Sequence, residues 1–599
     1  MKLNKILIAT AVLFTATAFT GCIREVFPKE SAITESQLSQ SDAGMEAMLK
    51  SVPASMAAHI AASYDHSDFG YHSIGLYKDH HALTMFPCTR PDRGGNPYYS
   101  RIQAPNYGFD MGPNGGYTHY IWYNYYPFIK KANDVIGAAG TDENLQEFRV
   151  IAKTFRALFY LDMVGYYDSL EAYAPELPSY NTDLSAVKGL IVPIVKENTD
   201  EDTAKKNPRA KREDMFKFIF EDLADAAETM KMFETDPEFK ATVYGSTPTY
   251  PQLAAVYGLY ARAYMWLGQF EEGIYTSIPA KDEDGKDIID EDGNLVYAYP
   301  NVFTGDAAYQ KALEYAELAI STANVPMMSE AEWTSVTQGF NTVVPAWIWA
   351  TQMSTDTVIN NLLAFAAHIS HEASYGYGPL ACVGVSKNTY DRLGATDFRK
   401  KLIIGENTTY EEFKKYTSMP KDEWEELAYR APYSFFKFRP GQGERVDYMV
   451  ANAISLPVMR IEEMYFIAME AKAHLGDTTG ALADLQSFMS NRASVYVNNN
   501  SDYAKLIDEI IFQKSVEFWG EGTILFDMKR LNMGVNTLNQ NYQSGMLFNT
   551  INPDGNDPQY KRLPWWNLPI PSGESTVNTV LKATVGPDPS YGVESEEAI

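Results

Sequence analysis

Cysteine is scarce in this chain, which has 599 residues and three cysteines. Cys22 ends an N-terminal apolar segment, so Cys88 and Cys382 are the one pair left for an internal bond. If the chain is exported, these two can form a disulfide; two buried thiols are the alternative. The sequence alone leaves both states open.

Long apolar runs are missing beyond residues 1–21, and no later segment has the roughly 20 apolar residues that a membrane-spanning helix needs. Basic residues are in the minority, with 50 Lys and Arg against 77 Asp and Glu and a formal net charge of -27. A chain this acidic repels phosphate backbones, so we expect no nucleic-acid partner. Neutral ligands such as glycans or peptides fit the composition better.

Motifs that mark enzymes are missing as well. No nucleophile elbow, metal-binding histidine pair or phosphate-binding loop stands out. We therefore expect a binding protein with no catalytic residues, no cofactor and no metal. Acidic residues are abundant, so an exported glycoside hydrolase with paired carboxylates stays an alternative.

The N-terminus is the most informative segment that is present. A cationic start precedes an apolar stretch, residues 6–19, that is too short to span a bilayer, and Cys22 follows a threonine and a glycine. This order is typical of a secretory leader, and the cysteine after a small residue resembles the lipobox of bacterial lipoproteins. We predict a signal peptide over residues 1–21, palmitate or a similar lipid on Cys22, and a single mature domain, residues 22–599, anchored to a membrane surface.

Apolar residues recur at helical spacing along most of the mature chain, which predicts a mostly α-helical fold. Aromatic residues make up 13% of the chain and include 40 tyrosines, a globular composition. The predicted helices cover residues 120–136, 145–165, 212–230, 253–267, 307–322, 460–475, 479–493 and 503–519, and most of them fall in pairs.

The pair at residues 460–493 has the features of a tetratricopeptide hairpin. Ala468 and Ala471 let two helices approach closely, and Gly476 ends the first helix. A similar unit is interrupted by residues 275–299, whose turn signals predict a β-hairpin.

Long segments rich in Gly, Pro, Asn and Tyr separate the helices, at residues 64–117, 326–393 and 534–599. The apolar run at residues 347–349 predicts a buried strand within the second of them. Loops this long in a compact protein are usually functional, and their aromatic content favours a binding role. We therefore predict tetratricopeptide-like helical hairpins, a large irregular loop-rich half and minor β-hairpins.

Several motifs together resemble the SusD/RagB family of Bacteroidetes outer-membrane lipoproteins. The strongest covers residues 457–471, an arginine-led helix with a Glu-Ala step. The others lie at residues 132–136, 155–160, 390–399, 491–493, 517–522, 527–530 and 568–571. This ordered series covers nearly the whole mature chain.

The resemblance implies a surface-exposed, lipid-anchored outer-membrane protein of nutrient uptake. In this family the protein binds a glycan and passes it to a TonB-dependent transporter of the SusC/RagA type. Peptide binding of the RagB type is the alternative within the family. An exported glycosidase ranks third, because it should lack the ordered series of motifs.

Ligand sites in this family lie in variable loops, so candidate residues are chosen by chemistry. Aromatic rings give sugars a rigid apolar face, and Arg, Asn and Asp side chains hydrogen-bond their hydroxyl groups. The predicted ligand-binding residues are Asp79, Tyr98, Tyr99, Arg101, Asn114, Tyr117, Trp122, Trp333, Tyr375 and Tyr377.

The charged residues of the family motifs have a different predicted role. Arg492, Glu517, Asp527 and Arg530 are expected to form a charged lattice between the last helices and the turn at residues 569–571. Buried ion pairs fix geometry more than they stabilise a fold, so we predict that these residues belong to the scaffold.

Overall fold

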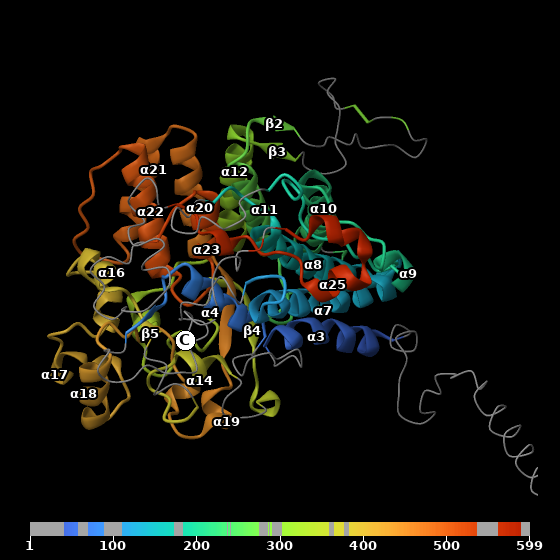
Figure 1. Ribbon diagram of the computed structural model, residues 1–599. Helices are drawn as coiled ribbons and strands as arrows, with labels where there is room; N and C mark the ends of the chain where they lie inside the picture. The colour runs from blue at the N-terminus through green and yellow to red at the C-terminus, as the bar shows by residue number, and fades with distance from the viewer. Residues whose placement is uncertain are drawn as a thin grey trace, which may run out of the picture.

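The computed structural model describes most of the chain beyond residue 40 (Figure 1). The described residues are 41–57, 70–88, 111–172, 184–236, 238–239, 241–274, 286, 288–289, 302–358, 364–376, 383–535, 561–586 and 588. The predicted signal peptide and Cys22 lie outside these ranges.

Five long helices form the first part of a helical scaffold (Figure 1). They are α7 (Gly116–Ala139), α8 (Gln146–Tyr167), α10 (Arg212–Thr235), α11 (Leu253–Leu267) and α12 (Asp306–Ala323). α7 packs on α8 and α11 packs on α12, which confirms both predicted pairs. α12 buries an alanine every three or four residues, and such small side chains allow close packing of helices.

The C-terminal hairpin has the predicted form. α20 (Ile461–His474) packs on α21 (Thr478–Met489), and α22 (Tyr503–Glu517) packs on both. Gly476, with a φ of 86°, ends α20, since glycine adopts positive φ without strain. The Asp477 carboxylate then caps α21 by accepting a backbone N–H bond at 2.9 Å.

These three helices enclose a small apolar core separate from the main one. Its buried members are Phe466, Met469, Ala473, Ala481, Leu485, Phe488, Met489, Leu506, Ile507, Ile510, Ile511 and Phe518. Most of the other buried apolar residues form one larger cluster that runs through the helical scaffold and the irregular half. The C-terminal helices are therefore a compact unit docked on a continuous core.

Three short antiparallel strand pairs tie distant segments together. β4 (Trp347–Gln352), which contains the predicted strand, pairs with β6 (Ser455–Arg460). β1 (Phe86–Pro87) pairs with β5 (Val383–Gly384). The third pair joins residues 273–274 (β2) to 303–304 (β3) at the base of the predicted hairpin, most of which lies outside the described residues.

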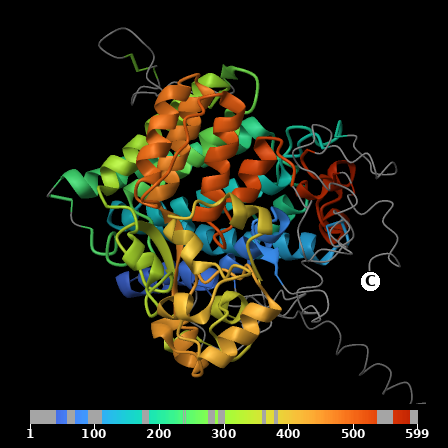
Figure 2. The same ribbon diagram turned by 90° about the vertical axis from the view of Figure 1, so that its left-hand side faces the viewer.

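Short helices and turns make up the irregular half, which lies below the long helices in Figures 1 and 2. The other helices are α3 (Asp42–Ala57), α4 (Tyr71–His81), α9 (Glu201–Ala204), α13 (Glu330–Thr334), α14 (Phe365–Ile369), α16 (Lys387–Arg392), α17 (Tyr410–Phe413), α18 (Lys421–Arg430), α19 (Tyr448–Ala451), α23 (Ile524–Arg530) and α25 (Ser572–Val577). 3₁₀ turns cover Glu143–Leu145, Thr355–Thr357, Phe398–Leu402, Lys414–Tyr416, Gly441–Gly443, Pro564–Trp566 and Thr579–Thr584. Within the described ranges, none of the helices combines the length and hydropathy that crossing a membrane requires. The predicted fold class is confirmed.

Cationic side chains from later in the chain cover the C-terminal end of α8. Lys529 Nζ donates to Gly165 O at 2.8 Å, and Arg209 Nη2 donates to Tyr167 O at 2.8 Å. Arg562 Nη1 reaches the backbone just beyond the helix, at the carbonyl of residue 171. The last carbonyls of a helix lack intrahelical partners and carry partial negative charge, so these cations satisfy and stabilise that end.

Candidate functional site

Glu517, at the end of α22, is the centre of a buried ionic network. Its side chain is 0% exposed. Arg399 donates to it at 3.2 Å and Arg460 at 3.1 Å, and Arg492 donates twice, at 2.9 and 3.0 Å. Burial alone would raise the pKa of Glu517, but Arg492 and Arg460 outweigh that effect and hold the pKa well below its ordinary value.

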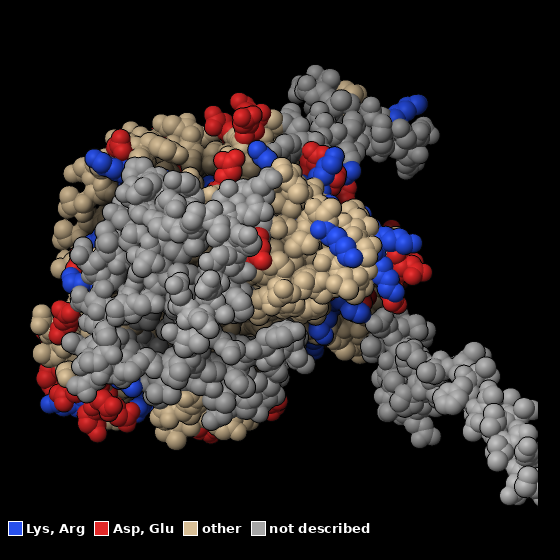
Figure 3. All heavy atoms as spheres, in the orientation of Figure 1, with Lys and Arg blue, Asp and Glu red and all other residues tan. Residues whose placement is uncertain are grey.

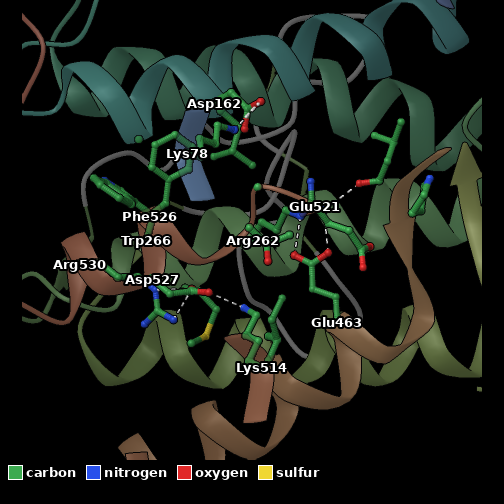
Figure 4. A pocket seen from close by; sticks show the side chains of 18 of the residues that line it. Lys78, Asp162, Arg262, Trp266, Glu463, Lys514, Glu521, Phe526, Asp527 and Arg530 are labelled. Carbon is green, nitrogen blue, oxygen red and sulfur yellow. Dashed lines mark hydrogen bonds and ion pairs between the residues drawn. The ribbon is translucent and has the colours of Figure 1, made fainter. Parts of the chain in front are cut away.

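A second group of charges lines a chamber between α4, α8, α11, α20 and α23 (Figure 4). Figure 4 shows its cations and carboxylates pointing toward one another. The pairs are Lys78 with Asp162 at 3.3 Å, Arg262 with Glu463 at 2.6 Å, Lys514 with Asp527 at 2.6 Å and Arg530 with Asp527 at 2.7 Å.

The chamber belongs to the scaffold. It encloses about 90 Å³, whereas ligand sites usually need about 300–1,000 Å³. Burial alone would raise the pKa of Glu463, but Arg262 outweighs it and lowers the pKa, so this pair stays charged and engaged. A small space whose charges are already paired suits ordered water better than a nutrient.

The predicted lattice of charged motif residues is present, but it is divided. Arg492 and Glu517 belong to the first network, whereas Asp527 and Arg530 line the chamber, and Arg530 also donates to Glu470. The turn at residues 569–571 is held differently, because Ile570 N donates to a backbone carbonyl, that of residue 585, at 2.7 Å. The predicted scaffold role is therefore confirmed for the ion pairs, with that turn attached by backbone hydrogen bonds.

An open groove of about 1,110 Å³ lies beside α22 and is the candidate ligand site. Its walls come from α16, α22, residues 82–84 after α4 and residues 531–535 after α23. These elements meet at the left of Figure 1, below the C-terminal hairpin. The volume exceeds the usual range for small-molecule sites, which suits an extended ligand.

Aromatic and polar side chains form the rim of the groove. Tyr503 is 46% exposed, and its hydroxyl lies 2.8 Å from His474 Nδ1, which fixes the position of the ring. The Arg392 guanidinium stacks over the half-buried Phe512 ring at 3.9 Å and donates to Asp508 at 2.8 Å. The rim therefore presents two rings in fixed positions before any ligand arrives.

The floor of the groove is aliphatic. Ile507, Ile511 and Val516 project from the inner face of α22, and Met528 and Leu531 adjoin them. Polar groups that line the walls are Ser386, Asn388, Thr389, Ser515 and Asn532. An apolar surface edged with hydroxyl and amide groups can accept the mixed faces of a sugar or a peptide.

Two predicted ligand residues lie at or near the surface. Asn114 is exposed at the start of α7, where its Oδ1 accepts a hydrogen bond from Ser572 Oγ at 2.5 Å. Tyr375 is half-buried, and its hydroxyl donates to Asn452 Oδ1 at 2.7 Å. The structure does not bring these two side chains into the groove.

Four other predicted residues are buried. Asp79 is 0% exposed in α4, where its Oδ2 accepts from Gly522 N at 3.1 Å and burial raises its pKa to about 7. Tyr117 is 8% exposed, Trp122 4% and Trp333 0%. These aromatic rings pack inside the core and present no open face to a ligand, because their segments fold inward against the helices.

The remaining predicted residues, Cys22, Tyr98, Tyr99, Arg101 and Tyr377, lie outside the described ranges. The groove residues were missed from the sequence. The polar side of α22 has the pattern of any solvent-facing helix, and two of the segments that face it, residues 82–84 and α16, lie more than a hundred positions away. An exposed tyrosine at the start of an amphipathic helix was the one available signal.

The chain was compared with known proteins. Residues 331–586 match the SusD/RagB family model, described as the SusD family. A SusD-like carbohydrate-binding protein from Bacteroides vulgatus has a TM-score of 0.59 and 18% identity, over 90% of this chain and 96% of that one. A SusD superfamily protein from Bacteroides thetaiotaomicron has a TM-score of 0.57 and 16% identity, over 90% and 98%. A SusD-like carbohydrate-binding protein from Bacteroides fragilis has a TM-score of 0.56 and 13% identity, over 91% and 100%.

No curated protein matches the chain. The two comparisons nevertheless agree, since the family model is that of the SusD family and the similar structures, which cover 90% of the chain, are SusD-like. The resemblance predicted from the ordered motifs is confirmed.

Proposed function

We propose that this chain, whose residues 331–586 match the SusD/RagB family model and whose fold is SusD-like, captures glycans at the cell surface and delivers them to a TonB-dependent transporter of the SusC type. In this proposal Cys22 carries the lipid that anchors the protein to the outer membrane. The protein itself binds and hands over its ligand without cleaving it.

One observation carries the proposal: the family match over residues 331–586 lies within a SusD-like fold that spans 90% of the chain. Two of the similar structures are described as carbohydrate-binding proteins. A binding role also accords with the buried pairs Arg156–Asp222, Arg262–Glu463 and Arg460–Glu517, in which arginines already engage the carboxylates.

The chemistry of the groove supports a glycan ligand. Sugars pack their C–H faces on flat side chains, which the Tyr503 ring and the Arg392 guanidinium stacked on Phe512 provide at the rim. Hydroxyl groups of the sugar would exchange water for the side chains of Asn388 and Thr389 on α16. The aliphatic floor also fits peptide side chains, which keeps RagB-type peptide binding as the second candidate.

The test is affinity electrophoresis and calorimetry of the purified chain against a panel of polysaccharides and a mixed peptide library. We expect retardation by at least one polysaccharide. The double variant Tyr503→Ala with Phe512→Ala should bind that polysaccharide about tenfold or more weakly, since stacking of a ligand ring on an aromatic side chain is worth about 1–3 kcal/mol. Tyr429→Ala is the matched control, because Tyr429 is 55% exposed on α18, outside the groove.

The outcomes separate the candidates. Binding of peptides and of no polysaccharide would reject the glycan proposal in favour of the RagB-type function. Release of reducing ends from a bound polysaccharide would support the glycosidase instead. Binding that survives the double substitution would place the glycan elsewhere, with the predicted loop residues such as Tyr98 and Tyr99 as the next positions to change.

The anchor and the transporter need their own test. Radiolabelled palmitate should appear on the wild-type protein and not on Cys22→Ser, because only the thiol accepts the diacylglyceryl group. Co-purification of the tagged protein from detergent-extracted outer membrane should yield a large barrel protein. Label on the serine variant, or recovery of the wild-type chain without any barrel partner, would contradict this part of the proposal.

A further inference from the structure

His474, the last residue of α20, lies directly behind the exposed tyrosine at the rim of the groove. Its side chain is 7% exposed, and its Nδ1 lies 2.8 Å from the Tyr503 hydroxyl. On the opposite side of the ring, Nε2 lies 3.2 Å from Glu470 Oε1. The imidazole therefore joins a buried carboxylate to a tyrosine that lines the groove.

Packing holds the imidazole in this position. The Tyr309 ring of α12 stacks on it, with ring centroids 4.0 Å apart and planes inclined by 7°. The Tyr503 ring of α22 meets it at 64°, with centroids 5.7 Å apart. Turning the imidazole would cost both of its hydrogen bonds, so each nitrogen keeps its own partner.

The buried carboxylate decides which nitrogen carries the proton. Arg530 Nη1 and Nη2 donate to the two Glu470 oxygens at 2.6 Å each. Burial alone would raise the pKa of Glu470, but Arg530 outweighs that effect and holds the pKa well below its ordinary value. An ionised carboxylate only accepts hydrogen bonds, so Nε2 carries the one proton of the neutral imidazole. Nδ1 is then an acceptor, and the Tyr503 hydroxyl donates to it.

The direction of this hydrogen bond determines what Tyr503 offers to a ligand. A phenol has one O–H donor and two acceptor lone pairs. Because His474 accepts the one proton, the oxygen can serve a ligand only as an acceptor. A sugar hydroxyl can donate to this oxygen while the C–H face of the sugar packs on the ring. An ether or ester oxygen has no proton to donate.

We propose that Glu470 and His474 hold the Tyr503 oxygen as an acceptor, so that the groove selects glycans with a free hydroxyl at the rim over O-alkylated or O-acylated ones. The inference rests on the proposed glycan-binding function and defines the ligand class for the same groove. His474 is a positioning residue in this arrangement, because it acts on the ligand through Tyr503.

Nitrogen-15 labelling of histidine tests the direction of the bond without any ligand. Spectra of the full mature chain are recorded at pH 8, where a histidine side chain is ordinarily neutral. The chain has nine histidines, and the signals lost in His474→Gln identify the pair from His474. We expect a protonated Nε2 and an unprotonated Nδ1. A protonated Nδ1 would overturn the inference whatever the protein binds.

Pairs of polymers test the selection itself. Dextran, laminarin, galactomannan and any further polysaccharide that the wild type retains are each compared with an O-methylated derivative by calorimetry at pH 8. We expect the wild type to bind the unmodified member more tightly. Tyr503→Phe keeps the ring and removes the accepting oxygen, so this preference should fall by about two- to tenfold, the usual value of one hydrogen bond.

Two substitutions at His474 separate positioning from structural support. A glutamine amide reaches the place of Nε2 and keeps the contact with Glu470, whereas an asparagine amide lies near Nδ1 and keeps an acceptor for Tyr503. His474→Gln should therefore lose the preference by the same two- to tenfold factor, because the freed phenol proton can now bond an ether oxygen. His474→Asn should retain the preference. Thermal melting checks that both variants are folded.

Tyr429 supplies the matched control for the change at Tyr503. Its side chain is 55% exposed on α18, outside the groove. Figure 3 shows carboxylates gathered at the lower left, over α17 and α18. The exposed acids there are Glu411, Glu412, Asp422, Glu423, Glu425 and Glu426. Tyr429→Phe removes a hydroxyl from this charged face and should leave the preference between the two polymers unchanged.

Failure of this inference is distinguishable from failure of the proposed function. If polysaccharides bind with the same preference in the wild type, Tyr503→Phe and His474→Gln, the selection is wrong and glycan capture stands. If His474→Gln and His474→Asn weaken both members of a pair equally, His474 has only a structural role and the inference is overturned. If no polysaccharide binds in either form, both proposals are overturned.

Discussion

Replacing Glu517 by glutamine tests whether the buried ionic network stabilises the scaffold as a balanced set. The substitution keeps the shape of the side chain and removes its charge. The network contains four cations and four carboxylates: Arg399, Lys437, Arg460 and Arg492 against Asp397, Glu462, Glu517 and Glu521. Without the central carboxylate, one positive charge is left uncompensated in the interior.

The cost follows from burial. Glu517 is 0% exposed and accepts four hydrogen bonds from arginines, at 2.9 to 3.2 Å. Removing one partner of a buried, hydrogen-bonded charge set destabilises a protein by about 3–5 kcal/mol, chiefly through the penalty on the charges left behind. A surface pair is worth about 0–1 kcal/mol. Glu411→Gln is the matched control, because Glu411 pairs with Lys414 at 2.6 Å on the exposed surface.

Urea unfolding of the mature chain at pH 7, followed by the fluorescence of its nine tryptophans, measures the difference. With an m-value of about 3 kcal/mol per M, Glu517→Gln should lower the midpoint by about 1 M or more. Glu411→Gln should shift it by less than about 0.3 M.

The pH dependence gives a second readout of the same residue. The pKa of Glu517 is lowered in the folded protein, so its contribution is fully present above the unfolded-state pKa of about 4.3 and is lost as the pH falls further. The gap between wild type and Glu517→Gln should therefore narrow below about pH 4. Equal midpoints for the two glutamine variants at pH 7 would refute the argument that the network is balanced around Glu517.

Three other predictions concern single sites. Asp79→Asn removes a carboxyl group whose pKa is raised to about 7 by burial. The carboxyl group stabilises the folded protein at low pH, and this contribution is lost as the pH rises toward 7. The urea midpoint of the variant at pH 8 should therefore equal or exceed that of the wild type, and a lower midpoint would contradict this. In Gly522→Ala, φ is 71° and the new Cβ would lie 2.4 Å from the backbone of α4, so the free energy of unfolding should fall by more than about 3 kcal/mol. In Gly476→Ala nothing lies within 4 Å of the new Cβ, so the loss should be about 1–2 kcal/mol. Equal losses would disprove the close approach of Gly522 to α4. The thiol of Cys88 is buried, so alkylation followed by mass spectrometry should label it only after unfolding, and rapid labelling of the folded chain would contradict its burial.

Helix positions were predictable because periodicity is a local signal. The predicted helix at residues 253–267 has the observed bounds of α11, and α21 ends at Met489 rather than at residue 493. The predicted last turn, residues 490–493, is not part of the helix, because Ala493 forms a β-bridge with Asp397 in the segment after α16. Long-range contacts of this kind set helix ends and leave no mark on periodicity.

The candidate site was less predictable because its parts are far apart in sequence. The groove brings α16, α22 and residues 82–84 together, and no local pattern reports such a meeting. Aromatic content misled the choice for Trp333, which is 0% exposed, since tryptophans in loops serve as core as readily as contact surfaces. The buried ion pairs were easier to predict from the sequence, because a charged side chain on the buried face of a helix needs an oppositely charged or hydrogen-bonding partner.

The cationic cover over the end of α8 has a consequence for how the protein is made. Lys529, which bonds the Gly165 carbonyl of α8, and Arg562, which bonds the backbone just beyond that helix, are synthesised more than 350 residues later. During synthesis α8 forms long before Lys529 is made, so the Gly165 carbonyl stays hydrated until late, whereas Arg209, which follows α8 closely, can bond the Tyr167 carbonyl much earlier. Truncations after α12 would therefore leave a nascent core with frayed ends, prone to proteolysis, and maturation becomes a late, whole-chain event rather than a stepwise one.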